Sequence, residues 1–257
     1  PRMNHIPVVN IPVQSHSSLD TFMTCPRMYK AKYITREVQF KPTIESRWGD
    51  HAHHHLELYI AAGGNYNIPV EINPKTSENM RDYQWVGDAL LNRAYQKGGR
   101  ILPERKFGIG HAKQPNNYFD KTGWVRGKID VTLLYDNIAE VTDFKTGKKK
   151  NDPDQVVLYS ASAMLDYPEV EIVKGGYIWL KEPMASAIDK PMTFTRDKLP
   201  DMWAPFDMKY SRLRHAYEND QFPPKKSGLC GWCDVESCEF QYVSPKKAAS
   251  LTMERGV

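Results

Sequence analysis

Apolar positions recur along the chain with two different periods, and the period decides which element each segment is expected to form. Alternation at every second residue predicts β-strands, whereas recurrence at every third and fourth residue predicts helices. The first pattern predicts strands at about residues 100–108, 124–135, 138–143 and 170–180. The second predicts helices that begin after Ser17 and at Pro26 and that cover about residues 44–62, 78–96, 153–166 and 197–219. This order predicts an α/β fold with a central mixed β-sheet flanked by helices.

Local signals mark the first two helices. Ser17 is expected to cap the first, with Asp20 where a capping box needs a carboxylate. Pro26 disfavours helix at the preceding Cys25 and suits the first turn of a new helix. The N-terminal part of the chain is therefore expected to form two short helices that meet at this bond.

Asp136-Asn137 separates two predicted strands and suits a two-residue hairpin turn. The numbers of facing residues then sum to 273, which places Asp130 opposite Asp143 and Lys128 opposite Lys145. Because side chains alternate between the two faces of a sheet, these four side chains are expected on one face. The other face pairs apolar residues and is expected to be buried: Ile129 with Phe144, and Tyr135 with Ile138.

Facing aspartates suggest a metal site. Carboxylates on directly opposed strand positions lie about 5 Å apart and repel each other, so an unassisted pair destabilises the sheet. A divalent cation shared by Asp130 and Asp143 removes that penalty. Lys145 follows Asp143 at the second position. Two carboxylates and a lysine in this order are typical of a metal-dependent phosphodiesterase.

Composition narrows the class of protein. At 257 residues and 29.6 kDa the chain is long enough for one large domain, and it contains no apolar run of 18 residues, so a membrane span is not expected. The segment Pro1–Val13 lacks the layout of a signal peptide. The net charge of +4 permits a polyanionic partner without requiring one. Lysines crowd just after the carboxylates, which favours a phosphate backbone: Lys145, Lys148, Lys149 and Lys150.

The cysteines form a second, independent signal. Cys230 and Cys233 have the C-x2-C spacing, Cys238 follows after four residues, and Cys25 lies far upstream. The chain is expected in the cytoplasm, either of its own cell or of a host cell if a phage encodes it. In that compartment this cysteine spacing favours a bound metal over disulfides. Four thiolates can hold a [4Fe–4S] cluster or tetrahedral Zn²⁺, and the spacing alone slightly favours zinc.

Together these motifs resemble the PD-(D/E)XK nucleases of the RecB-like branch, in particular the iron–sulfur exonucleases related to the CRISPR-adaptation nuclease and to the AddB subunit of AddAB. The resemblance covers about Ser15 to Phe240. It implies a single domain over residues 1–257 with a restriction-endonuclease-like core at about 44–182. N-terminal helices (15–43) and a cysteine-bearing C-terminal segment (197–240) would be joined by the metal cluster.

The resemblance also implies roles for individual residues. Asp130 and Asp143 would be metal ligands together with the backbone carbonyl of Phe144, and Lys145 would orient or deprotonate the attacking water. The family often has glutamate where Asp143 stands, so this carboxylate is one methylene shorter. The metal would be Mg²⁺ or Mn²⁺. Glu104 could add a further carboxylate.

The histidine-rich run at residues 51–55 matches the family pattern G-x-x-x-H-x-x-L-E when Gly49, His53, Leu56 and Glu57 are aligned to it. That alignment selects His53 as the metal-binding histidine. An imidazole ligand shifts the preference toward Mn²⁺.

Two further family features lie after the second carboxylate. Gln155 and Tyr159 form the motif Q-x-x-x-Y, whose residues would contact nucleic acid and order the active site, with Lys148 and Lys149 nearby. The resemblance favours the iron–sulfur cluster over zinc, although the relatives commonly have five residues before the last cysteine and this chain has four.

These features predict a metal-dependent DNA nuclease, an exonuclease acting on single strands or duplex ends. A structure-specific endonuclease, or a non-catalytic DNA-binding protein that kept the fold, remain the alternatives. The chain contains no helicase motif, so any helicase or recombination partner would be a separate chain. The sequence leaves the oligomeric state, the polarity of digestion and the strand preference open.

Overall fold

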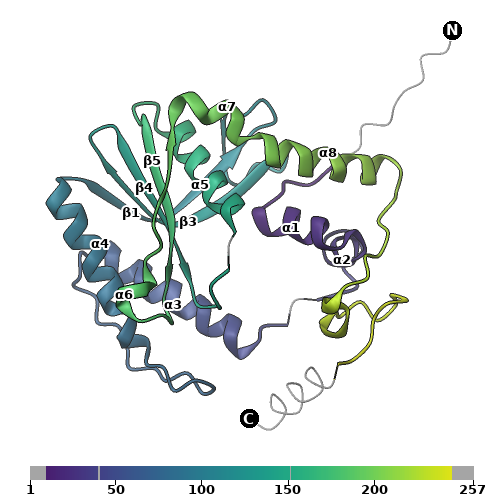
Figure 1. Ribbon diagram of the computed structural model, residues 1–257, viewed down its shortest axis with the longest axis horizontal. Coiled ribbons are helices and arrows are strands. Elements are labelled where there is room, and N and C mark those ends of the chain that lie inside the picture. Colours follow the sequence, from purple (N-terminus) through teal and green to yellow (C-terminus); the bar gives the residue numbers. More distant parts are fainter. Residues whose placement is uncertain (1–9, 40, 151, 245–257) are drawn as a thin grey trace. The chain divides into compact units, whose positions relative to one another are not determined.

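The structure is a computed structural model that describes residues 10–39, 41–150 and 152–244 (Figure 1). The chain divides into two compact units. One comprises residues 42–205, and the other joins the described residues before Pro42 to those after Pro205. Among the described helices, none has the length and apolar character needed to cross a bilayer.

The unit of residues 42–205 alternates helices and strands, as the sequence predicts. Its helices of eight or more residues are α3 (Ile44–Ala61), α4 (Gln84–Lys97) and α5 (Pro153–Asp166). Its strands are β1 (Arg100–Ile109), β2 (Pro115–Asn116), β3 (Val125–Tyr135), β4 (Ile138–Lys145), β5 (Ile172–Trp179) and β6 (Met192–Thr195). Short helical segments are η2 (Met80–Tyr83), α6 (Met184–Ala187), η3 (Arg196–Lys198) and α7 (Leu199–Met202).

The strands form one six-stranded sheet in the order β2-β1-β3-β4-β5-β6. The β4–β5 pair is parallel, and the other neighbouring pairs are antiparallel. The expected mixed sheet flanked by helices is therefore confirmed. The edge strands β2 and β6 were not predicted, because segments of two and four residues are too short to show alternation.

Alternation along β5 shows which helix covers which face of the sheet. Tyr177 and Trp179 pack with Val156 of α5, whereas Ile178 belongs to the core formed with α3. Successive strand residues point to opposite faces. The sheet is thus covered by α5 on one side and by α3 and α4 on the other (Figure 1).

Helix α3 combines a buried stripe with a polar face. The Thr43 side chain accepts a hydrogen bond from the Ser46 amide at its start, as an N-cap should. Trp48, Ala52 and Leu56 recur every fourth residue and are buried. The spacing that buries this stripe leaves the histidines and acidic residues on the remaining surface of the helix. This helix had been predicted within one residue of its observed end.

The β3–β4 hairpin has the register that the sequence predicts, but over a shorter length. Facing residues are paired from Tyr135 and Ile138 back to Val131 and Thr142. The recorded pairing ends there. On the outer strands Lys128 instead faces Lys106 of β1, and Lys145 faces Trp179 of β5. Beyond Val131 and Thr142 the β3–β4 ladder of the described residues does not continue, so the expected direct opposition of Asp130 to Asp143 and of Lys128 to Lys145 is not part of it.

The second unit contains α1 (His16–Thr24), α2 (Pro26–Tyr29), the π-helical turn η1 (Lys30–Ile34), α8 (Ala204–Glu218) and the short helix η4 (Gly228–Trp232). Its aromatic side chains pack together: the ring centroids of Phe22 and Tyr29 lie 5.6 Å apart, and Tyr29 stacks on Phe222 at 6.2 Å. Residues from the two ends of the chain thus share one core.

Three boundaries differ from the sequence expectation. Ser15, rather than Ser17, caps α1, and Ser18 instead of an acidic residue completes the capping box. The helix expected at 78–96 begins as the 3₁₀ turn η2 and becomes α-helical at Gln84. The single helix expected at 197–219 is divided into η3, α7 and α8. Prolines at the starts of the divided segments account for the breaks, because proline suits a first helical turn and not an interior one.

Candidate active site

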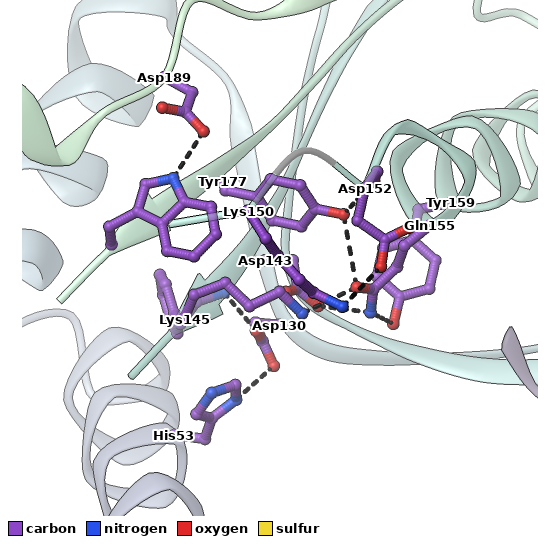
Figure 2. Close-up of polar contacts among 12 residues, drawn as sticks. His53, Asp130, Asp143, Lys145, Lys150, Asp152, Gln155, Tyr159, Tyr177 and Asp189 are labelled. Atoms are coloured by element: carbon purple, nitrogen blue, oxygen red, sulfur yellow. Dashed lines mark hydrogen bonds and ion pairs between the residues drawn. The ribbon is translucent and has the colours of Figure 1, made fainter. Parts of the chain in front are cut away.

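Asp143 and Lys145 lie at the C-terminal end of β4, two residues apart on the same strand. Asp143 is buried, and its Oδ2 lies 2.6 Å from Lys145 Nζ. Lys145 Nζ also donates to Gln155 Oε1 at 2.8 Å. The D-x-K motif of the sequence therefore forms an ion pair in the structure (Figure 2).

Asp130 lies beside this pair on β3, just beyond the end of the hairpin ladder. Its Oδ1 is 2.9 Å from His53 Nδ1, and its Oδ2 accepts the Phe144 backbone N–H at 2.6 Å. The Asp130 carboxylate thus accepts a backbone N–H of β4 that would otherwise donate to a backbone carbonyl of the neighbouring strand. Figure 2 shows Asp130 between His53 of α3 and Asp143 of β4.

The charges in this cluster shift one another's pKa values. Burial, reinforced by the negative charge of Asp130, raises the pKa of Asp143 to about 6, although Lys145 and His53 oppose the shift. Burial lowers the pKa of His53, but the hydrogen bond to Asp130 and the charges of both aspartates outweigh it, so the pKa rises. Burial is thus the main cause for Asp143, whereas the two aspartates favour the charged form of His53. A bound cation would offset the negative charge of the aspartates.

Gln155 and Tyr159 reach the cluster from the opposite side of the sheet to His53. Gln155 Nε2 donates to Asp143 Oδ1 at 3.2 Å and to the Tyr159 hydroxyl at 2.8 Å. The two residues lie one turn apart on α5, so a single helix face presents both. Tyr159 is buried. The predicted Q-x-x-x-Y motif therefore meets the D-x-K motif directly.

Helix α3 approaches the end of β4 closely at Gly49. A Cβ atom at this position would lie 2.9 Å from Thr146 Oγ1, closer than normal packing allows. The glycine of the G-x-x-x-H pattern thus lets His53, one turn later, reach Asp130. This is the physical reason for glycine at that spacing.

A cavity of about 560 Å³ adjoins the cluster. Its walls include His53, Asp130 and Lys145, and also Glu57, Glu104 and Lys128. Burial raises the pKa of Glu57, and the hydrogen bond and charge of Glu104 raise it further. Burial also acts to raise the pKa of Glu104, but hydrogen bonding to Lys128 outweighs it and lowers that pKa.

The sequence had not assigned Glu57 to the site, and it had left the place of Glu104 open. A signal for Glu57 was present, because it lies four residues after His53 and therefore on the same helix face. Glu104 has no such local signal. Its backbone φ of 42° is unusual for a strand, and Glu104 is left out of the β1–β3 pairing at the level of Asp130. Its position near Asp130 therefore follows only from the pairing of β1 with β3.

The basic segment after Lys145 is partly neutralised within the protein. Lys149 Nζ lies 3.0 Å from Asp189 Oδ1 and donates to the Ser186 carbonyl at 2.7 Å. Lys148 is exposed. The contact of both lysines with nucleic acid stays a prediction, and Lys149 would have to exchange Asp189 for a phosphate to make it.

The residue types of the cluster fit a hard divalent cation, but their arrangement is not that of a formed metal site. Within the described part of the chain, no three His, Cys, Asp or Glu side chains are grouped to hold an ion. Lys145 lies against the Asp143 oxygen that would bind the cation. That oxygen makes no hydrogen bond of ordinary geometry in the described structure, and it is buried. A cation would therefore have to displace the Lys145 ammonium from Asp143.

The four cysteines line one small cavity of about 20 Å³ in the second unit. No disulfide joins them. Backbone amides point at two of the sulfurs: the Lys225 N–H donates to Cys25 Sγ at 3.4 Å, and the Ser227 N–H donates to Cys230 Sγ at 3.3 Å. Burial raises the pKa of Cys233, and the charges of the neighbouring thiols raise it further. The fold thus brings together cysteines from both ends of the chain.

Comparison with known proteins identifies the family. The family model of the PD-(D/E)XK nuclease superfamily matches residues 14–238, which is most of the chain. The chain belongs to the PD-(D/E)XK nuclease superfamily. It is accordingly a nuclease. The assignment of Asp130, Asp143 and Lys145 to the motif from which the superfamily takes its name stays a prediction.

Solved structures resemble the chain only loosely. A candidate exonuclease from Eubacterium rectale has a TM-score of 0.49 and 12% identity, over 90% of this chain and 91% of that one. The protein SSO0001 has a TM-score of 0.36 and 14% identity, over 88% of this chain and 86% of that one. Such values carry no weight for function. No curated protein sequence matches the chain.

Proposed function

We propose that this PD-(D/E)XK nuclease is a metal-dependent deoxyribonuclease that hydrolyses phosphodiester bonds from the ends of DNA. The observation that carries the proposal is the meeting of His53, Asp130, Asp143 and Lys145 beside one open cavity. Carboxylates with an imidazole can hold a divalent cation, which assists the attack of water on a phosphodiester.

Asp130, Asp143 and His53 would hold the cation, with the Phe144 carbonyl as a further oxygen ligand. Oxygen donors with one imidazole suit Mg²⁺ or Mn²⁺. When bound, the cation neutralises charge on the phosphoryl oxygens and lowers the pKa of a water molecule. Burial and Asp130 raise the pKa of Asp143 to about 6, and a bound cation would favour its ionised form.

Lys145 is the residue placed to act on the attacking water. Released from Asp143, its ammonium can donate to a phosphoryl oxygen or hold the water in line. Gln155 restrains it, because Gln155 Oε1 accepts from Lys145 Nζ at 2.8 Å. Preorganised donors of this kind contribute mainly by stabilising charge that develops in the transition state.

Two substitutions test the proposal. Asp130→Ala and Lys145→Ala are each expected to lower the rate of Mg²⁺- or Mn²⁺-dependent DNA degradation by at least about 10³-fold. Lys198→Ala is the control, because that lysine is 63% exposed and pairs with Asp197. Retention of activity in the purified, folded Asp130 and Lys145 variants would contradict the assignment.

The mode of cleavage needs a second assay. Linear DNA labelled at one end and the same sequence as a closed circle are incubated with enzyme and Mn²⁺. An exonuclease releases mononucleotides or short products from the linear form and leaves the circle intact. Cleavage of the circle would indicate a structure-specific endonuclease instead. No cleavage of either form with any divalent cation would indicate a DNA-binding protein that kept the fold.

We also propose that Cys25, Cys230, Cys233 and Cys238 hold a [4Fe–4S] cluster, with structural Zn²⁺ as the alternative. The shared cavity and the amides directed at two sulfurs support a bound metal group. Four clustered thiolates repel one another unless a cation offsets their charge. Such a site requires a reducing compartment, which agrees with a cytoplasmic protein. A separate helicase or recombination protein would supply unwinding.

A further inference from the structure

Strands β1 and β3 carry a row of cations that leads to Asp130. Lys106 and Lys128 are directly opposed, and their side chains are 44% and 47% exposed. Arg126 lies two residues before Lys128, and Asp130 lies two residues after it. Residues two apart on a strand share a face. We call Lys106, Arg126 and Lys128 the basic strand face.

This face is the one turned away from α5. A Cβ atom at the intervening Gly127 would lie 2.7 Å from the Phe107 ring and 3.6 Å from the Tyr159 ring. Gly127 therefore points toward α5, and its neighbours Arg126 and Lys128 point the other way. Lys128 also lines the catalytic cavity, so the basic strand face is continuous with the candidate active site.

The two lysines of the basic strand face share one carboxylate. Directly opposed like charges destabilise a strand pair. Glu104 Oε1 lies 3.0 Å from Lys128 Nζ and 3.6 Å from Lys106 Nζ, so one carboxylate serves both ammonium groups. Glu57 lines the same cavity as Glu104. A bound anion would relieve the repulsion between the lysines.

At the far end of this face, the connection between β1 and β3 (residues 110–124, including the two-residue strand β2) presents aromatic rings. Phe119 is 72% exposed, and its ring centroid lies 5.1 Å from that of Tyr118. Asn117 Oδ1 accepts the Phe119 amide at 2.8 Å, and Asp120 Oδ1 accepts the Thr122 amide at 2.7 Å. These hydrogen bonds define the backbone conformation around Phe119. We call residues 110–124 the aromatic loop.

Arg126 joins the aromatic loop to the basic strand face. Its guanidinium carbon lies 5.4 Å from the Tyr118 ring centroid, and Nη1 donates to the Tyr118 carbonyl at 3.3 Å. Exposed aromatic residues that occur singly need no explanation. Here the exposed ring is the first member of a series that continues through Tyr118, Arg126 and Lys128 to Asp130.

We infer that a single-stranded polynucleotide reaches the catalytic carboxylates along this series, with one base stacked on Phe119 and phosphates bound by the basic strand face. The inference rests on the proposed function for the position of the cleaved bond. Stacking on a side chain needs an unpaired base with a free face, whereas the bases of a duplex are stacked on each other. Lysines and arginines along the backbone supply the charge complementarity.

Binding without hydrolysis tests the inference. A fluorescein-labelled 20-nucleotide single strand is titrated with protein in EDTA, and anisotropy gives Kd at several salt concentrations. Phe119→Ala is expected to raise Kd about tenfold. Lys106→Gln is expected to raise Kd and to reduce the salt slope by about 0.7.

Matched controls isolate the effect of position. Tyr95→Ala removes a ring that is 87% exposed on α4, and Arg100→Gln removes a charge at the other end of β1. Both are expected to leave Kd unchanged. Thermal melts confirm that the loop and strand variants are folded. The inference is overturned if Phe119→Ala and Lys106→Gln bind the single strand as tightly as these controls.

A duplex of the same sequence separates stacking from charge. Phe119→Ala is expected to weaken duplex binding by less than twofold, and an equal loss on both substrates would overturn the stacking role. EDTA removes the divalent cation, so binding is measured without cleavage. The inference about binding and the proposal about cleavage can therefore be contradicted independently of each other. A protein that binds in this way but hydrolyses nothing loses its proposed function only. A protein that cleaves DNA without using Phe119 or Lys106 loses this inference only.

Discussion

At the scale of single residues, Gln155 connects the groups on which the proposed chemistry depends. It accepts a hydrogen bond from Lys145 and donates to Asp143 and Tyr159. Lys145 and Asp143 would otherwise form only a direct ion pair, which holds the lysine away from a substrate. Gln155 gives Lys145 a second partner at 2.8 Å, so the ammonium can leave Asp143 without losing its position.

Gln155→Ala is therefore expected to lower the turnover rate by about 10- to 100-fold, the factor that corresponds to the free energy of a hydrogen bond with a charged group. Tyr159→Phe removes only the hydroxyl that binds Gln155 and is expected to lower the rate by about two- to tenfold. Single-turnover cleavage of end-labelled DNA measures both. Equal rates in Gln155→Ala and the unaltered protein would show that Lys145 is positioned without Gln155.

At the scale of secondary-structure elements, the buried Arg105 fixes α5 to the sheet that it covers. From β1 the guanidinium donates to Thr132 of β3 at 3.3 Å and to Ser162 of α5 at 2.9 Å, and it forms an ion pair with Asp166 at the end of α5. Burial lowers the pKa of Arg105, and burial also raises the pKa of Asp166 despite the attraction of the arginine. Burial thus disfavours the charged form of both residues, and each charge is stabilised by the other.

Arg105→Met would leave the Asp166 carboxylate without its partner. The free energy of unfolding is expected to fall by about 3–5 kcal/mol, the usual result of breaking a buried ion pair from one side. The double variant Arg105→Met with Asp166→Leu should recover much of the loss, because no buried charge remains. Urea denaturation measures both variants. A single variant as stable as the unaltered protein would mean that water reaches this pair.

At the scale of the whole molecule, the two ends of the chain meet in one unit. Arg27 forms an ion pair with Glu37 and donates to Ser237 Oγ at 2.6 Å, next to the last cysteine. Val235 packs with Ala31 and Val38. Between the end of α8 and residue 244 the only helix or strand is the short η4, so these contacts and the proposed cluster are what would hold residues 219–244 in place.

Cys233→Ser is expected to release the bound metal and to lower the melting temperature by about 10 °C or more. Leu229→Ser is the matched control, because Leu229 is 61% exposed in η4, the short helix that ends just before Cys233, and is not a proposed ligand. Anaerobic purification followed by visible absorption and elemental analysis distinguishes iron–sulfur from zinc. Unchanged metal content and melting temperature in Cys233→Ser would rule out a metal held by this cysteine.

Local signals in the sequence were enough to predict much of the catalytic unit. Alternation and the Asp136-Asn137 turn determine the hairpin register, because both depend on residues close together in the chain. The four-residue spacing of Gln155 and Tyr159 places them on one helix face for the same reason. The four cysteines were recognised by type and spacing alone, and all four line one small cavity. That they hold a metal stays a prediction.

Other features were decided only by the tertiary structure. The end of the ladder at Val131, the partner of Lys149 and the contact of Glu104 with Glu57 all join segments far apart in the sequence. Where a residue could pair with several distant residues, its neighbours in the sequence do not show which of them becomes the partner. Packing, burial and charge select the partner once the strands and helices meet. For this reason the sequence predicts the residue types of the site but not their contacts.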